Sequence, residues 1–419
     1  MSHAAPAIMP SAGDCRFCGT PLTESFVDLG ATPLANSYID PAASDQFEPR
    51  FPLHTYVCGT CFLVQLPAHE SPEEIFSDYA YFSSYSDSWL EHVKSYCAAM
   101  VERFGIDEHA RVVEVASNDG YLLQFFNERG VPVLGIEPAA NVAEVAEGKG
   151  IPTLVRFFGV QTAKRLAERG KQADLLIANN VLAHVPDIND FVAGLRLALR
   201  PSGVLTIEFP HLLKLLAETQ FDTIYHEHFS YFSLSTAERI LNSHGLKIFD
   251  VEELSTHGGS LRIFACREDS DRAATTNPRR VKQAERKAGL DRIETYRRFD
   301  ASARAVRQDL CDFLSGIKKA GKTIAGYGAP AKGNTLLNYC GIGPDLLPYT
   351  VDVSPHKQGR LLPGSRIPVL HPKTIAERKP DYVLILPWNI KQEIVAKMDD
   401  VRKWGGRFVV PIPEVKVLP

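Results

Sequence analysis

The sequence has no excess of positive charge and no long apolar run. Its 46 lysines and arginines are outnumbered by 50 aspartates and glutamates, which gives a formal net charge of -4. A surface with this balance has no general attraction for nucleic acid or for an anionic membrane. No stretch approaches the length of a membrane-spanning helix, and residues 1–13 do not form a charged segment followed by an apolar one. We therefore expect a cytoplasmic protein that binds neither nucleic acid nor membrane.

Cysteine is also scarce, since eight residues in a chain of 419 are too few for a disulfide scaffold. Four of them form two C-x2-C pairs, Cys15 with Cys18 and Cys58 with Cys61. Each pair places two sulfurs on one tight turn, and four thiolates complete a tetrahedral shell around Zn²⁺ that leaves no position for water. We therefore expect a structural zinc. A nucleic-acid zinc finger is disfavoured because the segment between the pairs has no basic face.

The length and the hydrophobic patterning of the chain predict several α/β domains. Residues 1–90 are rich in proline, glycine and aromatics and lack a helical period, which predicts a small, loop-rich, zinc-binding domain. Residues 91–266 alternate β-branched runs with amphipathic helices, which predicts a Rossmann-like parallel sheet. A charged helical connector is expected over 267–320, and a second Rossmann-like domain over 321–419.

The expected strands follow from short β-branched runs between turn signals. In the central domain we expect strands at 111–117, 131–137, 152–156, 174–180 and 203–209, followed by two more near 247–252 and 260–266. In the C-terminal domain we expect strands near 323–327, 348–353, 381–386 and 407–411, with a helix after the first of them.

A ligand site is predicted where the first strand of the central domain ends. The strand runs into the polar turn Ser117-Asn118-Asp119-Gly120, and Glu137 ends the next strand about 20 residues later, where a carboxylate can accept hydrogen bonds from ribose hydroxyls. The turn lacks a full G-x-G-x-x-G pattern, which favours S-adenosylmethionine over NAD. The expected cofactor-binding residues are Ala116, Ser117, Asn118, Gly120, Glu137, Phe157, Asn179 and Asn180. The alternative is an ordinary βα turn with a surface glutamate.

Histidine and tyrosine side chains gather at the same predicted edge. His184 follows the fourth strand, and residues 225–231 (YHEHFSY) follow the fifth. A group with a pKa near neutrality beside a carboxylate and phenols suits proton abstraction from a weak carbon acid, and we predict His228 as the base. A metal site at His226 and Glu227 is disfavoured because no third ligand is near. A hydrogen-bonded structural role is the alternative for each histidine, above all for His226.

Several motifs together resemble the deoxysugar C-methyltransferases, which act on nucleotide-linked 4-keto sugars. The motifs are the four cysteines and residues 78–86 (DYAYFSSYS), 114–121 (EVASNDGY), 225–231 (YHEHFSY), 257–262 (HGGSLR) and 326–333 (GYGAPAKG). They are distributed over nearly the whole chain. Ala116 stands where this family more often has glycine, a small change that should not exclude the methionine moiety.

The resemblance implies a zinc domain, a class I methyltransferase domain that binds S-adenosylmethionine, and a sugar nucleotide, expected to be dTDP-linked, between the middle and C-terminal domains. It implies that Tyr79, His184, Tyr225, Glu227 and His228 line the reacting sugar. His228 would remove the proton beside the ketone, Tyr79 or Tyr225 would donate to the enolate oxygen, and Glu227 would orient the base or hold the sugar. Lys332, at the start of a helix, is expected to hold the pyrophosphate, and His257 and Arg262 to bind substrate.

Two other enzyme classes stay open at this point. Gly326-x-Gly328 fits an NAD-dependent sugar oxidoreductase, although the third glycine of the fingerprint is missing. An O- or N-methyltransferase acting on another small molecule is the other alternative. The sugar, the nucleotide, the methylated carbon and the oligomeric state are left open as well.

Overall fold

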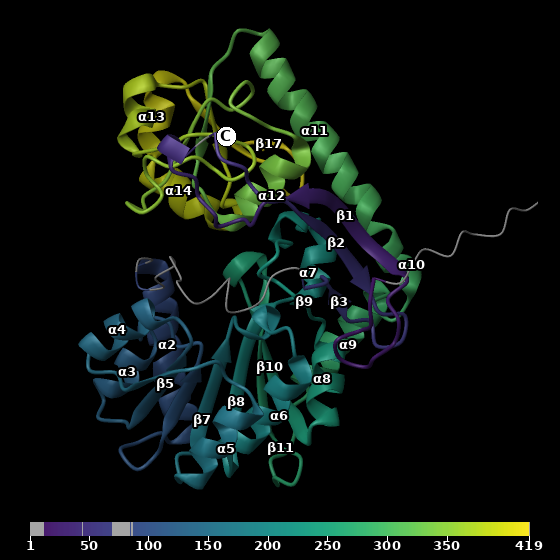
Figure 1. Ribbon diagram of the computed structural model, residues 1–419, viewed down its shortest axis with the longest axis vertical. Coiled ribbons are helices and arrows are strands. Elements are labelled where there is room, and N and C mark those ends of the chain that lie inside the picture. The colour runs from purple at the N-terminus through teal and green to yellow at the C-terminus, as the bar shows by residue number, and fades with distance from the viewer. Residues whose placement is uncertain (1–11, 44, 69–83, 85–86, 419) are drawn as a thin grey trace, which may run out of the picture.

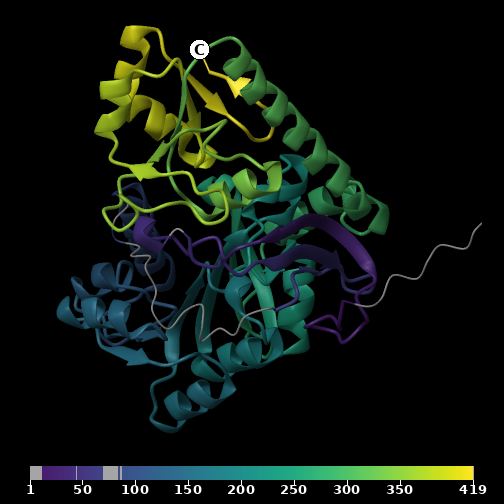
Figure 2. The same ribbon diagram turned by 45° about the horizontal axis from the view of Figure 1, so that its top comes forward.

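Three β-sheets organise the chain in the computed structural model, which describes residues 12–43, 45–68, 84 and 87–418 (Figure 1). The second and third sheets belong to two α/β domains, one below the other in Figure 1. The N-terminal strands cross between these domains, as the turned view in Figure 2 shows. In the part of the chain that the structure describes, no helix is both long enough and apolar enough to cross a bilayer.

The first sheet is antiparallel and has four strands in the order β1-β2-β3-β9. Its strands are β1 (Glu24–Thr32), β2 (Phe51–Val57), β3 (Val64–Gln65) and β9 (Ser230–Tyr231), with the short helix η1 (Pro41–Ala43) between β1 and β2. Sequence analysis expected a loop-rich domain over residues 1–90 and did not predict these strands. In β1, two register irregularities interrupt the period-2 pattern, whereas in β2 the buried residues Leu53, Thr55 and Val57 do alternate.

The second sheet has the order β10-β11-β8-β7-β4-β5-β6 and confirms all seven strands expected in the central domain. Five strands are parallel: β4 (Val112–Val115), β5 (Val133–Glu137), β6 (Thr153–Val155), β7 (Ala173–Asn179) and β8 (Leu199–Pro210). The last two, β10 (Leu246–Leu254) and β11 (Ser260–Arg267), are antiparallel. All four residues of β4 are buried, as expected for a parallel strand covered on both faces.

Helices cover both faces of this sheet. One face packs against α5 (Val160–Glu168), α6 (Ile188–Ala198) and α8 (Leu234–Ser243), and the other against α2 (Asp87–Phe104), α3 (Leu123–Asn127) and α4 (Ala140–Gly148). Shorter segments at the strand ends are η3 (Leu182–His184), α7 (Leu212–Ala217), η4 (Phe221–Thr223) and η5 (Thr256–Gly258).

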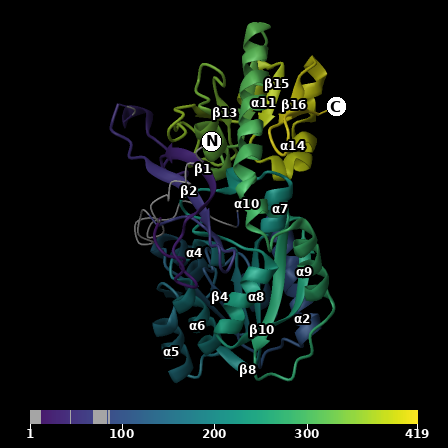
Figure 3. The ribbon, with the colours of Figure 1, turned by 90° about the vertical axis from the view of Figure 1, so that its right-hand side faces the viewer.

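The predicted connector forms three helices, α9 (Asn277–Ala288), α10 (Ile293–Arg297) and α11 (Phe299–Lys319). Figure 3 shows the long helix α11 extending upward beside the third sheet. Its buried residues, among them Ala303, Val306 and Leu310, recur at helical spacing and form one apolar face. At its N-terminal end the Phe299 ring stacks on Phe26 of β1, with 4.5 Å between ring centroids, which fixes the connector against the first sheet.

The third sheet has the order β14-β13-β12-β15-β16-β17. Its strands are β12 (Ile324–Tyr327), β13 (Thr350–Val351), β14 (Val369–Leu370), β15 (Tyr382–Ile385), β16 (Arg407–Val410) and β17 (Lys416–Val417). Its helices are α12 (Ala331–Cys340), α13 (Lys373–Arg378), η6 (Trp388–Ile390), α14 (Lys391–Lys397) and η7 (Asp399–Trp404). The four expected strands are confirmed, while the two-residue strand β14 and the antiparallel strand β17 were not predicted.

The five parallel strands of the second and third sheets have the same order. Read from β6, the second sheet runs β6-β5-β4-β7-β8 and then the antiparallel strands β11 and β10, while the third runs β14-β13-β12-β15-β16 and then the single antiparallel strand β17. In each sheet the strand order reverses beside the first strand, β4 or β12. Ligands bind open α/β sheets at the carboxyl ends of the strands at such a reversal, so the chain has two candidate ligand edges.

Candidate active site

A cavity of about 550 Å³ lies between the carboxyl edges of the two α/β domains. The turns after β4, β5, β7 and β8 form one wall, and residues 330–332 and Lys357 from the C-terminal domain form the other. The cavity brings together twelve of the predicted site residues: Ala116, Asn118, Glu137, Phe157, Asn179, Asn180, His184, Tyr225, Glu227, His228, His257 and Lys332.

Four predicted residues are not found in the cavity wall. Ser117 is fully buried within the turn. Gly120 has a φ of 74°, a conformation that favours glycine, and a Cβ there would come within 3.1 Å of the Ile151 side chain. Arg262 pairs with Glu208 at 2.6 Å, and this internal partner gives its predicted role in substrate binding no geometric support. Tyr79 lies outside the described residues.

The backbone at the lower wall of the cavity adopts left-handed conformations. The φ angles are 57° at Ala116, 49° at Asn118, 53° at Asn180 and 55° at His257. Asparagine tolerates this region, but an alanine Cβ makes it unfavourable by about 1–2 kcal/mol. This explains why glycine would suit position 116. Strained backbone of this kind persists where the surroundings enforce it and is typical of ligand sites.

Glu137 is held rigidly at the end of β5. Its Oε2 accepts a hydrogen bond from the Asn118 amide and its Oε1 one from the Ala139 amide, both at 2.9 Å. Burial raises the pKa of this carboxyl, and the two amides act in the opposite direction. Each oxygen still has a lone pair for a ligand hydroxyl. Among the described residues the buried Asn179 Oδ1 has no hydrogen-bond partner, so this wall fits a polar nucleoside such as that of S-adenosylmethionine.

The two histidines of the acid–base cluster are held in defined orientations. His228 Nδ1 donates to the Thr223 carbonyl at 2.9 Å, which leaves Nε2 to accept a hydrogen bond from the Tyr225 hydroxyl at 2.8 Å. His184 Nδ1 donates to the Glu227 carbonyl at 2.8 Å, and its ring lies 4.8 Å from that of His228. Burial lowers the pKa of His228 well below its usual value and that of His184 to about 4. Both imidazoles are therefore neutral, the form that accepts a proton, but burial places the pKa of His228 below the near-neutral range expected for the base.

Glu227 lies beside this pair and depends on the N-terminal segment. Its Oε1 accepts a hydrogen bond from Asn36 Nδ2 at 2.6 Å, and burial raises the pKa of its carboxyl to about 7. Asn36 carries no motif signal, and sequence analysis did not find it. His226 instead faces the first sheet, where its Nε2 lies 3.3 Å from the carbonyl oxygens of Phe51 and Pro52.

Lys332 is tied to the base by a chain of contacts. Its Nζ donates to Asn389 Oδ1 at 2.8 Å and lies 4.7 Å from the centre of the Trp388 ring. The Trp388 indole donates to Asp222 Oδ2 at 2.6 Å, and Asp222 precedes Thr223, whose carbonyl holds His228. Burial lowers the pKa of Lys332 and raises that of Asp222 to about 6. Sequence analysis missed Asp222, Trp388 and Asn389 because their roles depend on the packing of the two domains.

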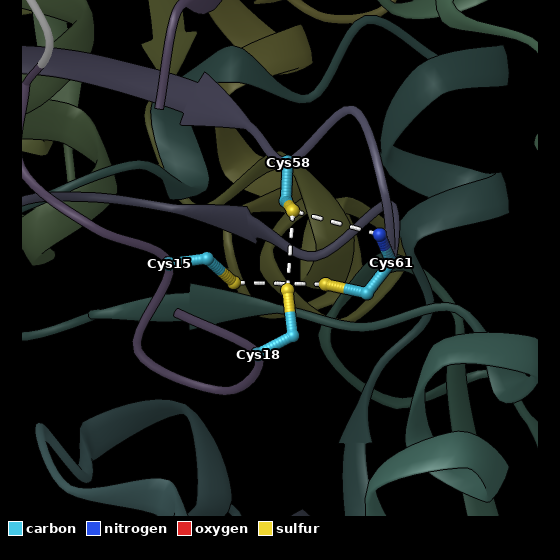
Figure 4. Close-up of side chains that lie close together, drawn as sticks. All are labelled: Cys15, Cys18, Cys58 and Cys61. Atoms are coloured by element: carbon cyan, nitrogen blue, oxygen red, sulfur yellow. Dashed lines mark hydrogen bonds between the residues drawn. The ribbon is translucent and has the colours of Figure 1, made fainter. Parts of the chain in front are cut away.

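The four cysteines of the two C-x2-C pairs converge, and their sulfur atoms all lie within 4.8 Å of one another (Figure 4). The Sγ atoms of Cys15 and Cys61 are 3.6 Å apart, and those of Cys18 and Cys58 are 3.5 Å apart. Zn–S bonds of about 2.3 Å in a tetrahedron place sulfurs about 3.8 Å apart, so the cluster fits a closed zinc shell.

The cysteine cluster is built into the wall behind the acid–base cluster. Gln65 of β3 donates from Nε2 to Cys15 Sγ at 3.1 Å, and β3 pairs with β9, which directly follows the loop carrying His228. Arg16 donates to the carbonyls of Leu66 and Pro186, the second of which belongs to the cavity wall. The metal-binding segment therefore supports the loop of the site.

Comparison with known proteins identifies the family. Residues 15–76 match the model of a zinc binding domain, 89–251 that of a methyltransferase domain, and 255–413 that of a C-methyltransferase C-terminal domain. The C-methyltransferase NovU of Streptomyces niveus is 38% identical over 405 residues, which cover 97% of this chain and 96% of that protein. The chain belongs to the C-methyltransferases. It is an S-adenosylmethionine-dependent enzyme with a zinc-binding domain at its N-terminal end, and the oxidoreductase alternative is wrong.

Two more distant relatives each match only part of this C-methyltransferase. A ubiquinone biosynthesis O-methyltransferase of Chelativorans sp. (strain BNC1) is 27% identical over 101 residues, which cover 24% of this chain and 40% of that protein. The magnesium protoporphyrin IX methyltransferase of Synechocystis PCC 6803 with bound SAM is 18% identical, covers 42% of this chain and 79% of that chain, and has a TM-score of 0.33.

Proposed function

We propose that the enzyme methylates a carbon next to the keto group of a nucleotide-linked 4-keto sugar, with dTDP as the expected nucleotide. The observation that supports this most directly is the neutral pair His184 and His228 inside a cavity that also contains Glu137 and Lys332. A C–H bond next to a ketone is weakly acidic because the anion spreads onto oxygen, and a positioned neutral base is needed to break it.

In the proposed reaction His228 Nε2 takes the proton of the sugar carbon. The Thr223 carbonyl fixes the tautomer and would stabilise the imidazolium, as would an ionised Glu227 nearby. The sugar displaces the Tyr225 hydroxyl from Nε2, and the hydroxyl then donates to the enolate oxygen. Bound at Glu137, S-adenosylmethionine supplies an electrophilic methyl group. The predicted role of Tyr79, whose position lies outside the described residues, stays a second option for this donor.

Each predicted domain would have its own role in the reaction. Residues 1–90 would support the catalytic loop, 91–266 would bind the methyl donor and carry the base, and 321–419, joined through 267–320, would hold the sugar nucleotide. Lys332 would hold the phosphate next to the sugar, since its Nζ lies in the cavity wall beside the base cluster.

The decisive experiment detects C–H cleavage and carbon methylation separately. With S-adenosylhomocysteine in deuterated water, we expect the enzyme to exchange the proton next to the ketone of a dTDP-4-keto sugar, and with S-adenosylmethionine we expect a new C–CH₃ signal by NMR. His228→Asn should lower turnover by about 10²–10⁴-fold while both ligands still bind by calorimetry.

Two results would overturn this proposal. A methyl group found on oxygen or nitrogen of the product would exclude transfer to the deprotonated sugar carbon. An His228→Asn enzyme that retains more than about a tenth of wild-type turnover would mean that another group, with Glu227 first in line, accepts the proton.

A further inference from the structure

The end of β13 repeats the arrangement found at the end of β5. Asp352 directly follows β13, and its Oδ2 accepts a hydrogen bond from the Ala329 amide at 2.7 Å. Its Oδ1 accepts a hydrogen bond from the Ser354 amide at 2.8 Å. Thus one carboxylate oxygen accepts a hydrogen bond from the turn after the first strand of the sheet, and the other accepts one from the amide two residues after the carboxylate residue itself.

Glu137 makes the same two bonds in the methyltransferase domain. One oxygen accepts from the Asn118 amide in the turn after β4, and the other from the Ala139 amide two residues further on. The strands correspond as well, because β13 pairs in parallel with β12 just as β5 pairs in parallel with β4. In open α/β sheets an acidic side chain at this position is the acceptor for a ribose hydroxyl.

The surroundings of Asp352 supply the other groups that a nucleotide needs. Lys357 lines the cavity, and its Nζ donates to the carbonyl of Ala329, the residue whose amide Asp352 binds. Next to Asp352, the side chain of Val353 is 65% exposed and offers an apolar surface. A cation, a half-buried carboxylate and an apolar surface at one strand end match a phosphate, a ribose hydroxyl and a base.

We infer that Asp352 binds a ribose hydroxyl of a nucleoside diphosphate, with Lys357 on the diphosphate. This inference rests on the proposed function, since the nucleotide is the one that carries the reacting sugar. The substrate then extends from the end of β13 past Lys332 to His228, while the nucleoside of the methyl donor occupies the equivalent position at Glu137. The enzyme would hold two nucleosides on two related sheets that face one cavity.

A cycle of protein and ligand changes tests this role. The ligands are thymidine diphosphate and 2′,3′-dideoxythymidine diphosphate, which lacks the 3′-hydroxyl, with binding measured by calorimetry. Wild-type enzyme should bind the dideoxy ligand about tenfold more weakly, as expected for the loss of one hydrogen bond to a charged acceptor. Asp352→Asn should bind the two ligands with nearly equal, weakened affinity. Its affinity for S-adenosylhomocysteine should stay within about twofold, which also shows that it is folded.

Matched variants assign the effect to the site. Glu137→Gln should show the reverse pattern, with weakened S-adenosylhomocysteine binding and unchanged thymidine diphosphate binding. Asp400→Asn, which changes an exposed carboxylate paired with Lys403, should change neither. Uridine diphosphate, with both ribose hydroxyls, is measured alongside because a carboxylate could bind either hydroxyl.

The outcomes separate this inference from the proposed function. If neither nucleoside diphosphate binds while S-adenosylhomocysteine does, the nucleotide-linked substrate is wrong and the inference fails with it. If thymidine diphosphate binds and wild-type enzyme does not distinguish it from the dideoxy ligand, the inference is overturned while the proposed function stands. The same holds if Asp352→Asn keeps the tenfold preference.

Discussion

The two α/β domains share a strand order and differ in the turn after the first strand. In the methyltransferase domain the turn after β4 has left-handed residues at Ala116 and Asn118 and lines the cavity. In the C-terminal domain the turn after β12 is tightly packed, and a Cβ on Gly328 would come within 2.5 Å of Pro387. Both turns have positive φ angles, since φ is 88° at Gly328, but Ala116 and Asn118 line the cavity whereas Pro387 packs against Gly328.

The difference extends to the side chains that each domain contributes. The methyltransferase domain supplies the neutral histidines and Glu227, and the C-terminal domain supplies the cations Lys332 and Lys357. A shared topology therefore fixes where ligands bind, while the residues after each strand decide which chemistry follows. Four sets of substitutions test this division, and we give them in order of expected effect.

Removing the zinc ligands should have the largest effect, because the N-terminal domain contacts both α/β domains. We expect Cys58→Ser with Cys61→Ser to abolish zinc binding, measured by elemental analysis, and to lower turnover by at least about 10²-fold as the catalytic loop loses its support. Cys311→Ala, which changes a cysteine outside the cluster, is the control. Full activity in protein with less than a tenth of an equivalent of zinc would show that the metal has no part in positioning the loop.

Lys332→Ala should separate the two ligands of the cavity. We expect the KM for the sugar nucleotide to rise about tenfold, since a half-buried cation is lost near the phosphates, while the KM for S-adenosylmethionine stays within about twofold. Steady-state kinetics with each substrate varied in turn measures both. Lys397→Ala changes an exposed lysine paired with Glu393 and should leave both constants unchanged. Equal increases for the two substrates would contradict the assignment of Lys332 to the sugar nucleotide.

The pH dependence of the reaction should depend on Glu227. Because burial raises the pKa of its carboxyl to about 7, Glu227 is protonated below that pH and ionised above it. The ionised form would stabilise the imidazolium at His228, so kcat/KM should fall about tenfold per pH unit below 7. The two histidines, with pKa values lowered by burial, stay neutral in this range. Glu227→Gln should give a lower rate that is flat from pH 6 to 8, and a profile that still titrates near 7 would assign the step to another group.

Substituting one alanine in each turn should give the smallest effects, with opposite signs. Ala116→Gly removes a Cβ from a left-handed residue and should stabilise the protein by up to about 1 kcal/mol after the added freedom of the unfolded chain is counted. Ala329 is buried and does not have a positive φ, so Ala329→Gly should destabilise by about 1 kcal/mol. Denaturant unfolding measures both. A destabilising Ala116→Gly would mean that the methyl group packs more favourably than the backbone strain costs.

The strands of the parallel sheets could be predicted from the sequence because each is a short, β-branched apolar run between turn residues. The strand that became β4 and the position of Glu137 at the end of β5 both follow from this pattern. The same approach failed for β1, where two irregularities in register break the alternation, and for the two-residue strand β9. A strand of two residues has no period, and only its partner β3 defines it.

The acid–base cluster could be predicted as a group of residues but not as a geometry. Residue types and predicted strand ends were enough to place His184, Tyr225 and His228 at one edge. The bond between Tyr225 and the basic nitrogen of His228, and the support of Glu227 by Asn36, depend on loops from distant parts of the chain. Arg262 shows the opposite case, because a motif residue that suggested substrate binding is paired with Glu208 inside the domain.

The pairing of β3 with β9 has a consequence for how the chain folds during synthesis. The first three strands of the N-terminal sheet are complete at Gln65, but the fourth consists of Ser230 and Tyr231, which the ribosome makes only after all five parallel strands of the second sheet. Domains generally fold in order from the N-terminus, and an unpaired strand edge is a template for unwanted pairing. The sheet of the zinc-binding domain therefore stays incomplete, with the edge of β3 unpaired, until the strands of the methyltransferase sheet have been synthesised. The loop that carries His228 is then fixed in place by the strand that closes this edge.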